Sequence, residues 1–265
     1  MDKEKYLTEF KQTKVNEIWQ DVWLKSGFAA ENIFSGSFFL EAWKVIEKYI
    51  PQKTEAILEV GGGSGRFGIK IAQTLPASKV VIIDIVDSSI SLINEVAKKI
   101  GLENVFALKG DVTRLSFPNN SFDLVFSDAV IQHVLDDEKA VWEMARVLKP
   151  GGILIVSVVN RWNFHSLYKL WLRIIGKEYE YKSERAYGKK ELRKLFKGQG
   201  LEIAVQDGFY PGYGILRLKS RHEIFKLLGR ICNRMFKILD RHTGRFFSKS
   251  FGFEIVIIGR KPPLL

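Results

Sequence analysis

Short apolar runs alternate with longer amphipathic stretches along most of this chain. Runs rich in β-branched residues predict strands that are buried on both faces, as in a parallel sheet. They lie near residues 57–60, 79–84, 104–109, 122–127, 153–159, 201–205 and 253–258. Helical spacing of apolar residues predicts helices over residues 64–75, 188–200 and 220–242. At 265 residues, the pattern fits one α/β domain with additions.

The most informative segment joins the first predicted strand to the first predicted helix. Residues 57–68 read ILEVGGGSGRFG. Glycines let the backbone turn tightly, and they let a ligand approach where a Cβ atom would collide. The helix that follows presents unpaired N–H groups at its start. The segment therefore predicts a site for a nucleotide-like ligand.

Two kinds of ligand fit this loop. Residues 63–68 satisfy G-x-G-x-x-G, the dinucleotide fingerprint, which is a weak signal when it stands alone. The loop also reads E-x-G-x-G-x-G from Glu59 to Gly65, and a carboxylate there would repel a pyrophosphate but suit an ammonium or a sulfonium group. Asp84 ends the second strand 19 residues after Gly65, where it can accept hydrogen bonds from both ribose hydroxyls of either ligand.

Three later motifs favour the second ligand. Gly110 and Asp111 end the third strand, FDLVFSDAVIQHV fills residues 122–134, and RVLKPGG fills residues 146–152. Together with the glycine loop and Asp84, they resemble the class I S-adenosylmethionine-dependent methyltransferases over about residues 55–160. The resemblance is greatest to the branch that includes small-molecule and quinone O-methyltransferases. A nicotinamide dinucleotide would explain only the loop and Asp84.

The resemblance implies a fold and a division of the chain. The expected fold is α/β, with a Rossmann-like, doubly wound, mostly parallel sheet of seven strands whose last strand runs antiparallel between its neighbours. An N-terminal helical cap is expected at residues 1–50, and a methyltransferase domain at residues 51–265. Helical insertions are expected at residues 160–181 and 209–251.

The resemblance also implies S-adenosylmethionine as the cofactor, with Asp111 at the adenine edge. The residues that match the family's binding positions are Glu59, Gly61, Gly63, Gly65, Asp84, Ile85, Asp111, Val112 and Ser127. Methyl transfer mainly needs alignment of the reactants and exclusion of water, but an oxygen or nitrogen acceptor can also need a base. His133 is the candidate base and Asp128 is a second one. Nothing resembles a metal-ligand cluster, so the sequence predicts metal independence.

The net charge of +11 is unevenly distributed. Residues 1–160 hold 18 basic and 21 acidic side chains, whereas residues 161–265 hold 23 and 9. This asymmetry predicts an anionic partner, namely a membrane surface, a nucleic acid or a phosphorylated substrate, unless it is only a solvated basic face. The basic residues come with no recognisable RNA-binding module, so a nucleic acid ranks below a small-molecule acceptor.

Both insertions leave two roles open. Residues 160–181 are rich in aromatic side chains and predict either a lid over the ligand crevice or a helix packed on the sheet edge. Residues 217–249 hold ten basic and two acidic side chains around a predicted amphipathic helix. Such a helix is typical of proteins that bind an anionic membrane surface, but it could also cover the active site with its apolar face inward.

The sequence thus predicts an enzyme that methylates an oxygen or nitrogen atom of a small, lipid-like or phosphorylated acceptor. An RNA or protein substrate is the alternative within this class. An NAD-dependent oxidoreductase and a non-catalytic adapter that binds S-adenosylmethionine are the alternatives from other classes. The single cysteine, Cys232, and the absence of an apolar leader in residues 1–12 predict a cytoplasmic protein, peripheral to a membrane if the basic helix binds one.

Overall fold

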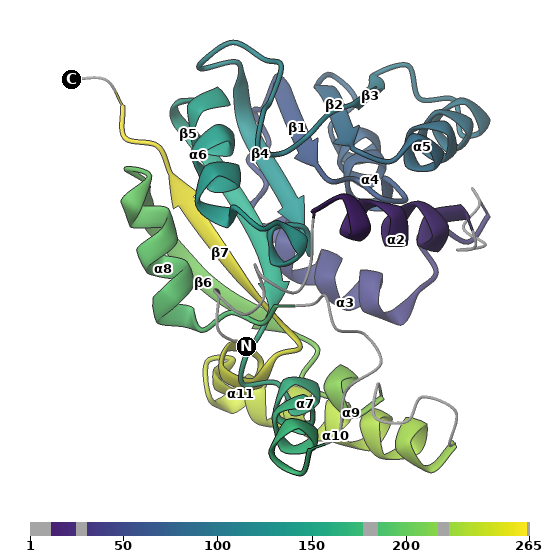
Figure 1. Ribbon diagram of the computed structural model, residues 1–265, viewed down its shortest axis with the longest axis vertical. Helices are drawn as coiled ribbons and strands as arrows, with labels where there is room; N and C mark the ends of the chain where they lie inside the picture. Colours follow the sequence, from purple (N-terminus) through teal and green to yellow (C-terminus); the bar gives the residue numbers. More distant parts are fainter. Residues whose placement is uncertain (1–11, 25–30, 177–184, 217–222, 264–265) are drawn as a thin grey trace.

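A seven-stranded sheet forms the centre of the computed structural model, which describes residues 12–24, 31–176, 185–216 and 223–263 (Figure 1). The strand order is β3-β2-β1-β4-β5-β7-β6. The strands are β1 (Ala56–Val60), β2 (Lys79–Asp84), β3 (Val105–Lys109), β4 (Phe122–Asp128), β5 (Leu148–Val159), β6 (Glu202–Phe209) and β7 (Glu254–Arg260). All neighbouring pairs are parallel except those of β7, which runs antiparallel between β5 and β6. The predicted fold is confirmed.

Helices precede, connect and extend the strands. The N-terminal part contains α2 (Gln12–Leu24), α3 (Ser37–Ile46) and η1 (Glu47–Tyr49). The connections contain α4 (Arg66–Thr74), α5 (Asp87–Lys99), η2 (Ile131–His133), α6 (Asp137–Val147), α7 (Phe164–Ile174) and α8 (Lys189–Gly198). Between β6 and β7 lie α9 (Tyr213–Leu216), α10 (Glu223–His242) and α11 (Phe246–Phe251).

Helices cover both faces of the sheet, because the apolar runs of the central strands place side chains on both sides. α6 and α8 pack on one face, in a core that includes Met144 and Phe196. α3, α4 and α5 pack on the other face, in a core that includes Ile69 and Ile93. The two cores hold the carboxyl ends of the central strands in fixed positions, and this is where the candidate site forms.

The start of the fifth strand differs from the sequence-based expectation. The sequence pattern predicts this strand near residues 153–159, yet α6 ends at Val147 and β5 already begins at Leu148. The pairing of β4 with β5 shifts register between Phe122 and Leu124. An irregular strand start of this kind accommodates a proline and a glycine with positive φ, as Gly151 has.

The two predicted insertions fold together beside one end of the sheet (Figure 1). The first contributes α7, and the second contributes α9, α10 and α11. α9 contacts both α7 and α10, while α11 packs on β6. Residues 177–181 and 217–222 of these insertions, like residues 1–11 and 25–30 of the predicted cap, lie outside the described part of the chain.

Arg146, the first residue of the RVLKPGG motif, ties the connection between β3 and β4 to α6. Its guanidinium donates hydrogen bonds of 2.8 to 3.0 Å to the carbonyls of Leu115 and Phe117 and to the Glu143 carboxylate. Glu143 in turn accepts a hydrogen bond from the Leu115 N–H. The motif residue therefore has a structural task, remote from the carboxyl ends of the strands.

Replacing Arg146→Ala should lower the free energy of unfolding by about 2 kcal/mol, because the Leu115 and Phe117 carbonyls lose a donor and the Glu143 carboxylate loses its ion-pair partner. Urea denaturation followed by circular dichroism measures this loss. Arg114→Ala, which removes an exposed arginine from the same connection, is the matched control and should change stability by less than about 0.5 kcal/mol. Equal effects of the two substitutions would contradict the structural role of Arg146.

Candidate active site

A cavity of about 250 Å³ opens at the carboxyl ends of β1, β2 and β4. The direction in which strands are added reverses between β1 and β4, and open α/β sheets bind ligands at such a switch point. The turn after β1, the segments after β2, β3 and β4, and one side of α2 line this cavity. Its lining includes the predicted residues Glu59, Gly61, Gly63, Asp84, Ile85, Asp111, Val112, Asp128 and His133.

The turn after β1 presents bare backbone to the cavity. Gly61 and Gly63 have φ angles of +70° and +55°, in the left-handed region that glycine adopts most readily. The N–H groups of Gly61 and Gly62 donate to the Ile83 carbonyl in β2, at 2.8 and 2.9 Å. A Cβ atom on Gly63 would lie 2.3 Å from the ring of Trp23. Side chains at Gly61 and Gly63 would collide with Val130 and Trp23, two residues that line the cavity.

Two predicted residues, Gly65 and Ser127, lie behind the cavity wall rather than in it. Gly65 caps the start of α4 in a left-handed conformation, and a Cβ atom there would lie 2.7 Å from Ile93. Ser127 is fully buried, and its hydroxyl donates to the Val60 carbonyl at 3.2 Å. Both residues shape the site by packing, which the motif spacing alone does not distinguish from ligand contact.

Glu59, the next-to-last residue of β1, is a buried carboxylate at the base of the cavity. Its side chain is 2% exposed, and Oε2 accepts a hydrogen bond of 2.8 Å from the Gly68 N–H in the first turn of α4. Burial raises the pKa of Glu59 to about 8, the bond from Gly68 opposes this rise, and the nearby charge of Asp128 adds to it. A cation in the cavity would stabilise the ionised form of Glu59.

Asp84 ends β2 and closes the other side of the glycine turn. Its carboxylate accepts the N–H of Gly63 at 2.7 Å and the N–H of Val86 at 2.9 Å. Burial raises the pKa of Asp84, and these backbone bonds act in the opposite direction. Asp84 thus holds the turn in place while it lines the cavity together with Ile85.

The loop after β3 supplies Asp111 and Val112. Oδ1 of Asp111 accepts from both the N–H and the hydroxyl of Thr113 at 2.8 Å, a local turn that orients the carboxylate. Val112 is buried, and Thr113 joins it in the cavity lining. Acid and apolar side chains therefore stand next to each other here, which suits a flat, partly polar ring such as adenine.

Asp128, the last residue of β4, is the second carboxylate at the base of the cavity. It accepts a hydrogen bond from the Ser157 hydroxyl, and its Oδ2 lies 3.8 Å from the guanidinium of Arg66. Burial raises the pKa of Asp128, while Arg66 and Ser157 lower it. Arg66 is the first residue of α4 and also lines the cavity.

His133 stands on the cavity wall in η2, next to the Trp19 ring at a centroid distance of 4.9 Å. Its Nε2 lies 3.3 Å from Nε2 of Gln132. Oε1 of Gln132 accepts the Val159 N–H, so the amide nitrogen is the atom that faces His133, and it can only donate. Nε2 of neutral His133 is therefore the acceptor, which leaves the proton on Nδ1.

Aromatic side chains of α2 form a wall that motif spacing did not identify. Trp19 and Trp23 line the cavity with their rings 6.0 Å apart, and Asn16 lies beside them. Arg66, Val130 and Val134 were also missed. Arg66 follows the third glycine of the E-x-G-x-G-x-G motif, which specifies no residue type there. The sequence shows the positive charge of Arg66 but not that it lies beside Asp128. The role of α2 as a cofactor cap stays a prediction.

Neither insertion contributes a described residue to this cavity. The lid role of residues 160–181 therefore stays a prediction, and α7 instead contacts α9. Within the described part of the chain, His, Cys, Asp and Glu side chains form no group of three or more that could hold a metal ion. Metal independence likewise stays a prediction.

Known methyltransferases resemble this chain over longer stretches than the motifs alone. Residues 51–200 match the family model for a methyltransferase domain. The ubiquinone/menaquinone biosynthesis C-methyltransferase of Cronobacter sakazakii is 34% identical over 122 residues, which cover 45% of this chain and 49% of that relative. The demethylmenaquinone methyltransferase of Geobacillus stearothermophilus is 31% identical over 174 residues, covering 59% and 74%. The chain spans about half the length of the first of these relatives.

Solved structures with lower identity share the fold. A methyltransferase in a complex with the Haloferax volcanii Trm112 methyltransferase activator superposes with a TM-score of 0.66 at 18% identity, covering 92% of this chain and 97% of that one. An S-adenosylmethionine-dependent methyltransferase from Thermotoga maritima gives a TM-score of 0.62 at 21% identity, covering 93% and 99%. At these identities the likeness concerns the fold alone.

The affinity for S-adenosylmethionine should rise with pH between about pH 6 and pH 9, because a cationic ligand favours ionised Glu59, which is mostly protonated in the free protein at neutral pH. Calorimetric titration across this range measures the effect. Glu59→Gln should remove the pH dependence and weaken binding at high pH about 10- to 100-fold. The control Asp87→Asn, which changes an exposed acid of α5, should keep the pH dependence of the wild type. A wild-type affinity that falls as the pH rises would refute the role of Glu59.

Replacing Gly63→Val should weaken the binding of S-adenosylhomocysteine more than about 100-fold, since the side chain would displace Trp23 from its place in the cavity wall, while backbone strain lowers stability by about 1–3 kcal/mol. Gly101→Val is a matched control, because Gly101 has a φ of +72° but nothing within 4 Å of its Cβ position. The control should lose the stability that backbone strain costs, without a collision, and keep its affinity, as measured by calorimetry and thermal denaturation. Unchanged affinity of Gly63→Val would remove Gly63 from the site.

Proposed function

Because the chain belongs to the class I S-adenosylmethionine-dependent methyltransferases, we propose that it transfers a methyl group from that cofactor to a small, lipid-like acceptor carrying a hydroxylated ring. The observation that carries this proposal is the composition of the cavity. Carboxylates lie at its base, whereas Trp19, Trp23, Val130 and Val134 provide an aromatic and apolar wall.

The cofactor supplies a methyl group already activated by a sulfonium centre. The bare turn at Gly61 and Gly63 accommodates it, and the carboxylates of Glu59, Asp84 and Asp128 favour its positive charge over the pyrophosphate of a nicotinamide dinucleotide. The oxidoreductase alternative is therefore not proposed. In this assignment Asp84 binds the ribose, and Asp111 with Val112 holds the adenine.

The acceptor wall favours a ring over a charged or polymeric substrate. The rings of Trp19 and Trp23 stack on each other in the cavity lining, and Val130 and Val134 come from the segment that follows β4. Aromatic side chains pack well against flat rings. The quinone methyltransferases among the relatives also favour a ring as the substrate. One of these names specifies methylation of carbon, so carbon joins oxygen and nitrogen as a candidate acceptor atom.

A hydroxylated ring becomes reactive at its oxygen, or at the neighbouring ring carbon, when the hydroxyl loses its proton. We assign His133 as the base that accepts this proton, because its ring lies against Trp19 on the acceptor wall. The only lone pair of the neutral ring is on Nε2, so the acceptor hydroxyl replaces the Gln132 amide there before it gives up its proton. Gln132 positions the imidazole. Asp128 is held by Ser157 and lies next to Arg66, and we assign it to the side of the cavity that binds the positively charged cofactor.

A titration and a turnover assay test the proposal together. The wild-type protein should bind S-adenosylmethionine and S-adenosylhomocysteine in the micromolar range and bind NADH far more weakly. It should methylate hydroquinones with apolar side chains when these are supplied with labelled cofactor. Binding of the cofactor without turnover on such rings, or on a lipid extract, would instead support the adapter alternative. Turnover on RNA or protein alone would support a macromolecular substrate.

His133→Gln should lower kcat by about 10²- to 10⁴-fold, because the base is lost. The affinity for S-adenosylhomocysteine should stay within about twofold, since the proposal places His133 on the acceptor side. A pH profile of kcat for the wild type should show an acidic limb that disappears in the variant. An unchanged kcat would remove His133 as the base, and Asp128→Asn would then be compared in the same assay.

A further inference from the structure

α10 has three distinct faces along its length. At about 100° per residue, Gly229, Phe236 and Asp240 share one face, and all three are buried. A second face carries the basic side chains Lys226, Arg230, Arg234, Lys237 and Arg241. The third face spans about 120° and consists of exposed apolar side chains, Ile224, Leu227, Leu228, Ile231, Met235, Ile238 and Leu239. In a soluble helix such an apolar stripe normally faces the core.

α7 repeats this arrangement on a smaller scale. Leu167, Leu170, Trp171 and Ile174 follow the spacing i, i+3, i+4, i+7, and all are exposed, Ile174 to 73%. His165 and Leu172 form the buried side of the same helix. Two neighbouring helices of one insertion layer thus present apolar stripes to the outside.

Neither stripe results from a detached helix. The ring of Phe236 in α10 stacks on that of Phe164 in α7 at a centroid distance of 6.0 Å. The backbone of Gly229 packs so closely against Gly212 that a Cβ atom on Gly212 would lie 2.5 Å from the Gly229 carbonyl oxygen. Asp240 accepts backbone hydrogen bonds from Phe247 and Ser248 at the start of α11. The packed face holds α10 in place while its apolar stripe points outward.

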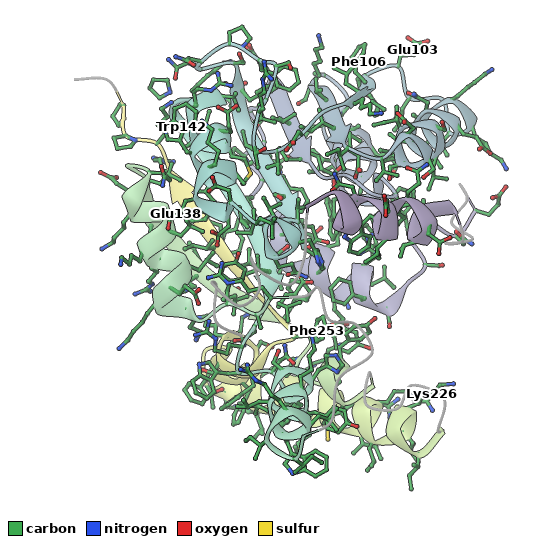
Figure 2. All side chains as sticks on the ribbon, viewed as in Figure 1. Glu103, Phe106, Glu138, Trp142, Lys226 and Phe253 are labelled. Carbon is green, nitrogen blue, oxygen red and sulfur yellow. The ribbon has the colours of Figure 1, made fainter. Side chains whose placement is uncertain are left out.

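The surface of the insertion layer carries a consistent charge. The basic face of α10 lies directly beside its apolar stripe, and α7 carries Arg173 as an exposed basic side chain. Within the basic face of α10, Lys237 is paired with Glu41 of α3 at 2.6 Å. Among the described side chains of α10 the only acid is Asp240, which is buried. Figure 2 shows side chains of α7 and α10 extending away from the sheet, with Lys226 near the outer end of α10. An apolar stripe beside a basic row complements a surface with anionic headgroups above hydrocarbon.

We propose that this α7–α10 face, formed by the two apolar stripes and the adjoining basic row, docks the protein on the surface of an anionic lipid bilayer. The apolar stripes enter the boundary between headgroups and acyl chains, and the basic side chains bind lipid phosphates. Among the described helices none is long and apolar enough to cross a membrane. A second copy of the chain is a poorer occupant, because a symmetric pair would bring two basic rows together.

Docking does not depend on the methyl acceptor, because no described residue of this face lines the candidate active site. Failure of methyl transfer would therefore leave the docking proposal intact, and the reverse also holds. If both proposals are correct, the acceptor and the enzyme meet at the same surface.

Vesicle sedimentation tests the proposal with the full chain. The protein should sediment with vesicles of phosphatidylglycerol and phosphatidylcholine, and the bound fraction should fall at high salt and with pure phosphatidylcholine. Ile231→Asp combined with Ile238→Asp should reduce the partition coefficient at least tenfold. Arg230→Gln combined with Arg234→Gln should reduce it about fivefold per arginine. Leu108→Asp, at an exposed apolar residue of β3, adds negative charge elsewhere and should leave binding unchanged.

Each variant is checked by circular dichroism and by its affinity for S-adenosylhomocysteine, so that a loss of vesicle binding is not a loss of folding. A wild-type protein that stays in the supernatant with anionic vesicles overturns the proposal. Unchanged vesicle binding by the Ile231→Asp, Ile238→Asp double variant also overturns the proposal. Sedimentation velocity tests the alternative of a dimer. If the wild type forms a dimer that does not bind vesicles, and the double variant is monomeric, the face binds a second copy of the chain instead.

Discussion

The buried carboxylate of Glu59 is the constraint on which the rest of the site depends. It joins the end of β1 to the first turn of α4 through Gly68, so the glycine turn between them is held at both ends. Removing a carboxylate from water costs free energy unless a charge or several donors compensate, and the rise of its pKa to about 8 reflects that cost. A cationic ligand supplies the compensation. The group that shapes the turn therefore also selects the sign of the ligand's charge.

The distribution of charge separates two tasks. The chain as a whole carries +11, yet the base of the cavity presents Glu59, Asp84 and Asp128, with Arg66 beside the last of these. Net charge acts over a range set by salt and cannot choose a ligand inside a cavity, where near neighbours dominate. The excess of basic residues lies instead in the second half of the chain and, on α10, beside an exposed apolar stripe.

The sequence predicted the strands and most of the cavity because both depend on local pattern. Continuous apolar runs identify buried strands, and the acids at their ends, Glu59 and Asp84, meet because parallel strands bring their carboxyl ends to one edge. The wall formed by Trp19 and Trp23 could not be predicted in the same way. It depends on where α2 packs, about 40 residues before the glycine turn. For Ser127, the motif located the strand end but not the direction of the side chain.

α10 illustrates a second limit. Periodicity predicts that a helix has an apolar face, but it does not say whether that face meets the protein or something outside it. Here the helix packs on the protein through residues that lie outside its main apolar stripe, including a glycine and a buried aspartate. Gly229 allows close approach to Gly212, and Asp240 caps the start of α11. Once these contacts hold the helix, no described part of the chain covers its larger apolar face, and the adjoining basic row makes a lipid surface the complementary one.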